Sequence, residues 1–203
     1  ARILENGRDV LAITPLGALG EVEASAELPP RSEETSLRVT RRDGAGAILF
    51  EHDEPMLAFS VQVEVLADGA IAVLAEDRTF GRTPRLLVLE ADGALRYRVA
   101  LAGESASFAA LPSGNLLVTL TGTTAGLVIA GPVSGGDRAT PLMLELDRAG
   151  RVVRGDQLAC GGLVTVARAR DGSVRLLANV DELFRPRSQP ITRESLVSAV
   201  VVP

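Results

Sequence analysis

The single histidine of the chain, His52, stands in the run Glu51-His52-Asp53-Glu54. Carboxylates beside an imidazole are the groups from which metal sites and acid–base pairs are built. A metal site, however, usually draws on more converging ligands than one short run supplies. As the only histidine, His52 also limits Ser-His-Asp triads to one candidate. We therefore expect an exposed acidic loop here, with no metal-binding or catalytic role.

Two pairs of acids, Glu76-Asp77 and Asp181-Glu182, are the other carboxylates whose arrangement could serve catalysis. A glycosidase holds two carboxylates at a set separation across the bond that it cleaves. Both pairs fall in expected long loops, where solvated charge is the simpler interpretation. Clustering of all four acids at one mouth of the fold would instead favour an enzyme that acts on carbohydrate.

Three further patterns predict no site. Cys160 has no histidine near it in the sequence, so we expect a small buried side chain rather than a nucleophile. The glycine-rich run 131–136 lacks the Gly-Lys-Ser/Thr ending of a phosphate loop, and no helix pattern follows it. The Asp-Gly pairs lack the spacing of a calcium loop, and turn chemistry explains them. The sequence thus predicts no catalytic residue, no metal ligand and no cofactor.

Composition argues against several classes of partner. The net charge is −5, and every basic residue is an arginine scattered among acids, apart from the pair Arg41-Arg42. Without a basic stripe we expect no nucleic-acid partner. Hydrophobic residues make up 46% of the chain, which is enough for a sizeable core. Apolar runs such as 196–202 are far shorter than the roughly 20 residues of a membrane helix, so we expect no membrane span.

Strand patterns dominate the chain. Short apolar, β-branched runs are separated by glycine that follows Asp, Asn or Ser, and glycine adopts the positive φ of tight hairpin turns without strain. The expected strands lie at 10–14, 59–66, 70–74, 85–89, 116–120, 142–146, 163–167, 174–178 and 196–202.

The turns are of two kinds that alternate. The first kind comprises Asn6-Gly7, Asp68-Gly69, Ser113-Gly114 and Asp171-Gly172, and the second comprises Asp43-Gly44, Asp92-Gly93 and Ala149-Gly150. The spacing predicts a unit of about 45 to 62 residues, the range of propeller blades and solenoid turns. Each unit consists of strand A, a short turn, strand B, a long loop, strand C, a short turn and strand D.

Four such units are expected, at 2–53, 58–101, 106–158 and 161–202, in one repeat domain that spans 1–203. The first has only a stub of strand A at Arg2 to Leu4, and the last lacks strand D. A single meander cannot bury both faces, so neighbouring units must stack. Strands B and C are apolar, and strand D carries alternating arginines, as an outer edge does. We expect an all-β, propeller-like array of about four blades, the first and last incomplete, within a larger propeller or assembly.

Residues 114–153 have a distinctive order: a Gly-Asn strand, a Thr-Gly step, a glycine-rich insertion and a closing strand. Leu142, Leu144, Leu146, Asp147 and Gly150 form that closing pattern. This stretch resembles the bacterial β-propeller repeats called SBBP repeats, although their closing Trp is missing here. The resemblance implies a propeller fold and an exported protein, secreted, periplasmic or at the cell surface, while a cytoplasmic location stays open. It implies no activity, because the family shares no catalytic residues.

The alternation of turns sorts the connections onto two ends of the blades. All the short turns share one end, and the long loops 15–34, 76–84, 121–141 and 179–194 share the other. Variable loops on a rigid scaffold are where binding usually occurs. We expect a non-enzymatic module that presents these loops to a protein or glycan partner, or that assembles with other copies of the repeat.

Two alternatives stay open: a propeller hydrolase or lyase acting on carbohydrate, and a purely structural repeat of a surface or fibre protein. The apolar edge that ends at Val202 is expected to be paired, either with the segment from Arg2 to Leu4 or with a partner.

Overall fold

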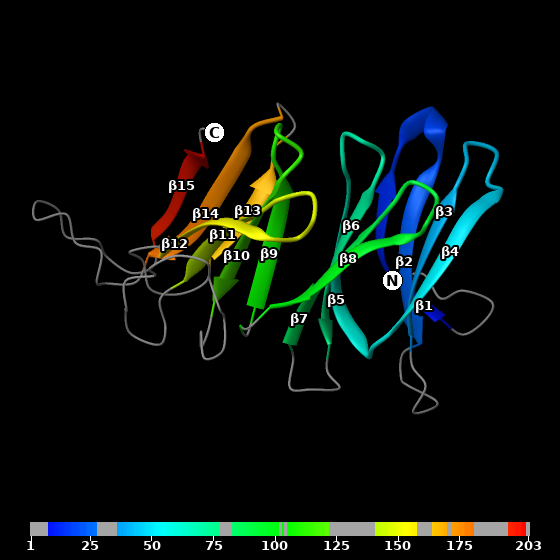
Figure 1. Ribbon diagram of the computed structural model, residues 1–203, viewed down its shortest axis with the longest axis horizontal. Helices are drawn as coiled ribbons and strands as arrows, with labels where there is room; N and C mark the ends of the chain where they lie inside the picture. The colour runs from blue at the N-terminus through cyan, green and yellow to red at the C-terminus, as the bar shows by residue number, and fades with distance from the viewer. Residues whose placement is uncertain are drawn as a thin grey trace, which may run out of the picture. The chain divides into compact units, whose positions relative to one another are not determined.

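The computed structural model describes residues 8–27, 36–77, 83–101, 103, 105–121, 141–157, 164–169, 172–180 and 195–201. In these residues the regular secondary structure consists of strands and one short 3-10 turn (Figure 1). The strands form four antiparallel sheets that follow one another along the chain. The all-β class predicted from the sequence is therefore confirmed. The chain divides into two compact units, residues 1–100 and 101–203, and each unit contains two sheets.

The first unit holds two four-stranded meanders in which sequence neighbours pair. A 3-10 turn, η1 (Gly17–Leu19), joins the first two strands. The strands of the first sheet are β1 (Arg8–Pro15), β2 (Glu21–Glu27), β3 (Ser36–Arg42) and β4 (Ile48–Pro55). Those of the second sheet are β5 (Ala58–Val65), β6 (Ile71–Asp77), β7 (Thr83–Leu89) and β8 (Leu95–Ala100).

The second unit holds one four-stranded and one three-stranded meander among the residues described. The strands of the four-stranded sheet are β9 (Ser105–Ala110), β10 (Leu116–Thr121), β11 (Leu142–Leu146) and β12 (Val152–Gln157). Those of the three-stranded sheet are β13 (Val164–Arg168), β14 (Val174–Val180) and β15 (Ser195–Val201).

The first sheet corrects the sequence-based prediction. The expected long loop 15–34 contains β2, so this sheet has four strands and is not an incomplete one. The strand reads Glu-Val-Glu-Ala-Ser-Ala-Glu, and its Val22, Ala24 and Ala26 are buried in the core. Alanine and glutamate have low strand propensity, so only burial against a second sheet reveals this alternation as a strand. The expected stub 2–4 and the turn Asn6-Gly7 lie outside the described residues.

The tight turns have a common geometry. In the turn between β5 and β6, the Leu66 amide donates to the Ala70 carbonyl at 2.8 Å, and the Gly69 amide donates to the Leu66 carbonyl at 2.9 Å. Gly69 has φ 84°, the left-handed conformation of a three-residue hairpin loop with a glycine bulge. The same pair of hydrogen bonds recurs at Gly46, Gly93, Gly114, Gly150 and Gly172.

One turn differs in position from the prediction. The pair Asp43-Gly44 does not carry the left-handed residue of the turn between β3 and β4. Gly46 carries it, with φ 85°, and Asp43 is the first residue of the turn. The Asp43 carboxylate accepts hydrogen bonds from the amides of Ala45 and Ala47, both at 2.9 Å, which fixes the turn two residues further along the chain.

In each four-stranded sheet, the turn between the first two strands lies against the turn between the last two. In the first sheet the first of these turns is η1, which the prediction had placed in the long loop 15–34 at the opposite end. In the second sheet, Arg96 binds Asp68 of one turn and Glu90 of the other. In the four-stranded sheet of the second unit, the Arg148 guanidinium donates to the Ser113 carbonyl at 3.5 Å. In the first sheet, a Cβ on Gly20 would overlap the carbonyl oxygen of Arg42. The connections from the second to the third strand therefore leave each of these sheets at the opposite end.

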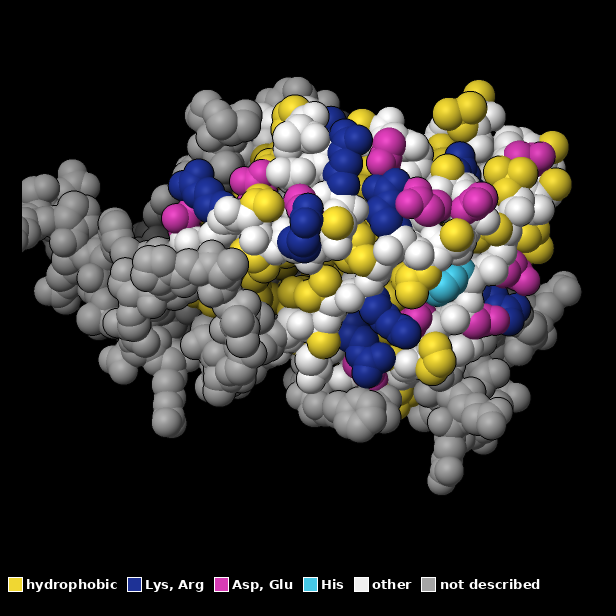
Figure 2. Space-filling model, viewed as in Figure 1, with side chains coloured by type: hydrophobic (Ala, Val, Ile, Leu, Met, Phe, Trp, Pro, Cys, Tyr) yellow, Lys and Arg dark blue, Asp and Glu magenta, His cyan; other side chains and the backbone are white. Residues whose placement is uncertain are grey.

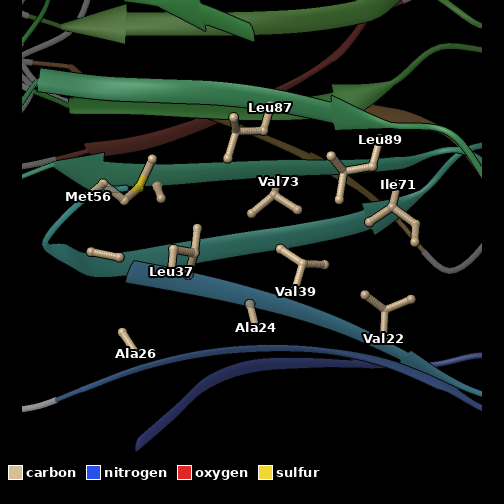
Figure 3. Packing of buried hydrophobic residues seen from close by; sticks show 12 residues of the cluster. Val22, Ala24, Ala26, Leu37, Val39, Met56, Ile71, Val73, Leu87 and Leu89 are labelled. Atoms are coloured by element: carbon tan, nitrogen blue, oxygen red, sulfur yellow. The ribbon is translucent and has the colours of Figure 1, made fainter. Parts of the chain in front are cut away.

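The core of the first unit lies between its two sheets. Side chains of β2 and β3 face side chains of β6 and β7, and Met56 of the connecting segment closes one end (Figure 3). At the inner strands, the Thr14 hydroxyl of β1 donates to the Val63 carbonyl of β5 at 2.9 Å. The labelled residues of this cluster are Val22, Ala24, Ala26, Leu37, Val39, Met56, Ile71, Val73, Leu87 and Leu89.

The core of the second unit joins its two sheets with apolar and polar contacts. Ala109 and Leu117 pack with Val166 and Val174. Beside them, Ser107 and Thr119, both buried, share a hydrogen bond of 2.6 Å between their hydroxyls. These hydroxyls also bind backbone groups of β13, which forms an edge of its sheet among the residues described.

Candidate functional site

The run Glu51-His52-Asp53-Glu54 lies in β4, so the expected exposed acidic loop is wrong. β4 is an outer strand of the first sheet. Successive side chains of a strand point to opposite faces, which divides this run into two separate pairs. Glu51 and Asp53 are exposed, whereas Glu54 is buried and His52 is half-buried. Four consecutive polar residues suggest a loop when read alone, and only the neighbouring strand β3 shows the alternation.

The exposed pair binds an arginine of β3. The Arg38 guanidinium donates two hydrogen bonds to the Asp53 carboxylate, at 2.9 and 2.7 Å, and lies 3.7 Å from a carboxylate oxygen of Glu51. Arg38 and Asp53 are direct cross-strand partners, which sets up this two-point contact. The hydrogen bond to Asp53 raises the pKa of Arg38, and partial burial opposes that rise.

Of the two residues that point inward, Glu54 forms an ion pair that joins the first sheet to the second. Glu54 is 3% exposed, and its carboxylate accepts a hydrogen bond of 3.0 Å from Arg98 of β8. The Nε2 atom of His52 lies 3.8 Å from the other carboxylate oxygen. That nitrogen is buried and has no hydrogen-bond partner among the described residues. The carboxylate therefore serves an arginine contact and is not presented to solvent as a catalytic acid.

A second buried carboxylate lies at the end of β6. Asp77 is 1% exposed and forms an ion pair of 2.9 Å with Arg85 of β7. The expectation of solvated charge is thus wrong for Asp77. Glu76 precedes it in the same strand and points to the other face, so these two acids do not converge on one point. Asp181 and Glu182 lie outside the described residues, as do Cys160 and the glycine-rich run 131–136.

The carboxylates of the tight turns bind their own turns. One oxygen of Asp147 accepts hydrogen bonds from the amides of Ala149 and Arg151, both at 2.9 Å, and the other binds the Arg151 side chain. The Arg151 amide, with help from the other donors, holds the pKa of Asp147 below its ordinary value. Both carboxylate oxygens of Asp147 thus stabilise its own turn, which is the ordinary role of an aspartate at this position. In the part of the chain that the structure describes, no group of three or more His, Cys, Asp or Glu is placed to hold a metal ion.

Arg96 links the two tight turns of the second sheet through charge. It lies 2.7 Å from Glu90 and 3.0 Å from Asp68. The hydrogen bond to Glu90 raises the pKa of Arg96, and the same contact lowers the pKa of Glu90. The sequence predicts only edge protection for this arginine, because Asp68 is 28 positions away and Glu90, 6 positions away, lies on the other side of a turn.

On the face that Figure 2 shows, neither the basic nor the acidic side chains form a single patch. Figure 2 shows arginine side chains interspersed with carboxylates over the described residues. Close pairs account for much of this pattern, including Arg154 with Asp156 at 2.7 Å. Among the helices of the described residues, none has the length and apolar character needed to cross a membrane.

These observations define an all-β protein of consecutive antiparallel meanders, in which the buried carboxylates of Glu54 and Asp77 are held by arginines. No family model matches the chain, and no curated protein matches it either. Among solved structures, it is similar to a protein of unknown function from Bacteroides caccae, with a TM-score of 0.49 and 14% sequence identity over 87% of this chain. The chain spans about half of that protein's length (55%).

Proposed function

We propose that this chain is a non-enzymatic binding module, in which the consecutive sheets act as blades of a propeller-like array. The surface proposed to bind is formed by the connections from the second to the third strand of each sheet. They comprise residues 28–35, 78–82, 122–141 and 181–194. One observation carries the proposal: the paired tight turns occupy one end of each four-stranded sheet, which leaves these connections at the other.

The strands at the base of one connection are held firmly, as a binding scaffold requires. Asp77 ends β6, and its buried ion pair with Arg85 ties β6 to β7 on the two sides of residues 78–82. The ion pair between Glu54 and Arg98 joins the first sheet to the second. A scaffold fixed in this way can present connections of varied sequence without losing its own packing.

The chemistry of the described residues favours binding over catalysis. Two of the buried carboxylates, those of Glu54 and Asp77, each contact an arginine. The Asp147 carboxylate is used by its own turn. An acid that is held by a permanent cation is poorly suited to exchange protons with a substrate.

A protein is the partner that the composition of the connections favours. They contain Phe80 and Phe184 but no Trp or Tyr. A sugar would find few aromatic faces to pack against, whereas the apolar and arginine side chains of these connections suit a peptide surface. An exported location belongs to the same proposal and rests on the resemblance to SBBP repeats.

The experiment is a selection of binding peptides from a displayed library against the immobilised chain. Selected peptides are then measured against a variant in which a short Gly-Ser linker replaces residues 122–141. We expect binding to weaken by about tenfold or more, which corresponds to at least ~1.4 kcal/mol. The matched control is Arg148→Ala in a tight turn, which should bind as the unaltered chain does.

Two outcomes would contradict the proposal. Peptides whose binding depends on the tight turns and not on any of the four connections would assign the surface to the other end. Hydrolysis or elimination of a polysaccharide by the purified chain would overturn the non-enzymatic function. Binding in a parallel glycan array, with no peptide selected, would replace the protein partner by a glycan.

A further inference from the structure

His52 and Glu54 lie on the same face of β4, because successive side chains of a strand alternate. Their cross-strand partners on β3, Val39 and Leu37, point into the core between the first and second sheets (Figure 3). The His52 side chain is 18% exposed and the Glu54 side chain is 4% exposed. The single histidine of the chain therefore lies at the rim of the contact between two sheets, beside a buried carboxylate.

The two carboxylate oxygens of Glu54 face different groups. One accepts a hydrogen bond of 3.0 Å from Arg98 of β8, which belongs to the second sheet. The other lies 3.8 Å from the Nε2 atom of His52 on its own strand. A neutral imidazole brings no charge to this oxygen, whereas a protonated imidazole brings a full positive charge. Glu54 can thus face one cation or two, and protonation of His52 decides which.

Among the described residues, the other charged groups on this side of the first sheet and on the strands that it faces are arginines. Arg41 of β3 points to the same side as His52, and its guanidinium donates to the Ala91 carbonyl of the second sheet at 3.1 Å. Arg96 of β8 is bound by two acids of its own sheet. The core side chains of β2, β6 and β7 in this contact are apolar. The carboxylate that a protonated His52 meets is therefore that of Glu54.

We propose that His52 makes the contact between the first and second sheets sensitive to pH. At neutral pH the carboxylate of Glu54 attracts Arg98, and this ion pair joins β4 to β8. When His52 gains a proton, Arg98 is attracted by the carboxylate and repelled by the imidazolium beside it. Because the two cations lie at similar distances from the carboxylate, 3.0 and 3.8 Å, a large part of the attraction is cancelled.

This ion pair lies at the end of the first sheet where its connection from the second to the third strand is attached. Glu54 stands opposite Leu37, the second residue of β3, which follows the connection 28–35. Acidification should therefore loosen the two sheets near that connection. The coupling between His52 and Arg98 exists whether or not the connections bind a partner, so this inference and the proposed function can fail independently.

The first test compares the loss of stability caused by Arg98→Ala at two pH values, by urea denaturation. About pH 7.5 and about pH 5.5 lie on either side of the ordinary pKa of histidine and above that of carboxyl groups. We expect the loss at the lower pH to be about half of the loss at the higher pH. In the His52→Gln background the two losses should differ less, because glutamine is polar but takes up no proton.

A matched control separates the histidine from the buried acid itself. Arg85→Ala leaves Asp77, a second buried carboxylate, without its arginine, and the chain has no second histidine to act there. Its pH dependence therefore measures what a buried acid contributes alone. We expect that dependence to match the one found in the His52→Gln background, and to be smaller than the one found with His52 present.

The second test needs no variant and therefore does not depend on the folding of Arg98→Ala. In an NMR titration of the unaltered chain, the guanidinium signals of Arg98 should move together with the ring signals of His52. Ring signals that stay constant between the two pH values would overturn the proposal, because His52 would then not change its charge. Arg98 signals that ignore the titration of the ring, or equal pH dependence with His and Gln at position 52, would also overturn it.

Discussion

The carboxylate of Glu54 on β4 lies 3.0 Å from the guanidinium of Arg98 on β8, so an ion pair joins the outer strands of the two sheets in the first unit. Glu54 is buried, while the Arg98 side chain is 61% exposed. The arginine therefore covers the carboxylate from the solvent side and supplies the charge that its burial demands.

Removing the cation should destabilise the first unit. In Arg98→Ala, Glu54 stays buried without its partner, so we expect the free energy of unfolding to fall by about 1–2 kcal/mol. The loss is smaller than for a fully buried ion pair, because solvent screens the charge of the exposed Arg98. Urea denaturation measures this change. Arg154→Ala removes a more exposed arginine, on the outer strand β12, whose partner Asp156 is half-buried, and it should cost less than about 0.5 kcal/mol. Equal effects of the two variants would refute the role of burial.

A side chain at Gly93 should lower the stability strongly, because Gly93 packs on an aromatic ring. It has φ 89°, and a Cβ there would lie 2.6 Å from two ring carbons of Phe50. Gly46 has a similar φ of 85° but open space around it. We expect Gly46→Ala to cost about 1 kcal/mol for the left-handed backbone alone, and Gly93→Ala to cost about 1–3 kcal/mol more. The loss of stability in the two variants is measured by thermal unfolding.

A second substitution distinguishes the ring contact from other causes. Phe50→Leu in the Gly93→Ala background should recover part of the lost stability, although Phe50→Leu alone lowers it. Purely additive effects of the two substitutions would show that the ring is not the obstacle.

The buried hydroxyl groups of Ser107 and Thr119 in the second unit should stabilise the position of strand β13. The Ser107 hydroxyl oxygen accepts a hydrogen bond of 2.8 Å from the Val166 amide, and Thr119 donates to the Val164 carbonyl at 3.2 Å. Ser107→Ala leaves a buried amide without an acceptor, so we expect a loss of about 1–3 kcal/mol. Hydrogen exchange at the Val166 amide should accelerate. Thr121→Ala, which removes a hydroxyl bonded at 3.5 Å in a less buried place, is the control.

Asp147 should make its turn sensitive to acid. Because the folded state lowers the pKa of this carboxyl, its contribution to stability is complete above the unfolded pKa of about 3.9. That contribution is lost as the pH falls from there through the lower folded pKa. A carbon-detected NMR titration of the Asp147 carboxyl should give a midpoint below 3.9. In Asp147→Asn, the acid-induced change of the Ala149 amide shift should disappear. A midpoint at or above 3.9 would contradict the hydrogen-bond arrangement.

Much of the fold was predictable because its signals are local. Most of the tight turns were predictable through glycine, since a left-handed residue has to stand at one position of these hairpins, but the turn between β1 and β2 was missed. The central strands were found through continuous apolar runs such as Ile71–Ala75, which the structure buries. Strand β2 was missed because its alternation of glutamate with alanine and valine resembles a polar loop until a second sheet covers one face.

The site depended on partners that are distant in the sequence. Glu54 and Arg98 are 44 positions apart, and Arg96 and Asp68 are 28 apart. No pattern within a few residues shows that two side chains so far apart will meet. The packing of one sheet on the next brings Glu54 to Arg98, and the approach of two turns within one sheet brings Asp68 to Arg96.

The sequence by itself determined that this chain forms β-strands, where most of its hairpins turn, and which residues can form a core. These properties follow from local backbone conformation and from the transfer of apolar side chains out of water. Only the tertiary structure decided that Glu54 and Asp77 are buried against arginines. The reason is physical: burial of a charge is costly unless a counter-ion or hydrogen bonds offset it, and for these two acids the packing of strands supplies the counter-ion.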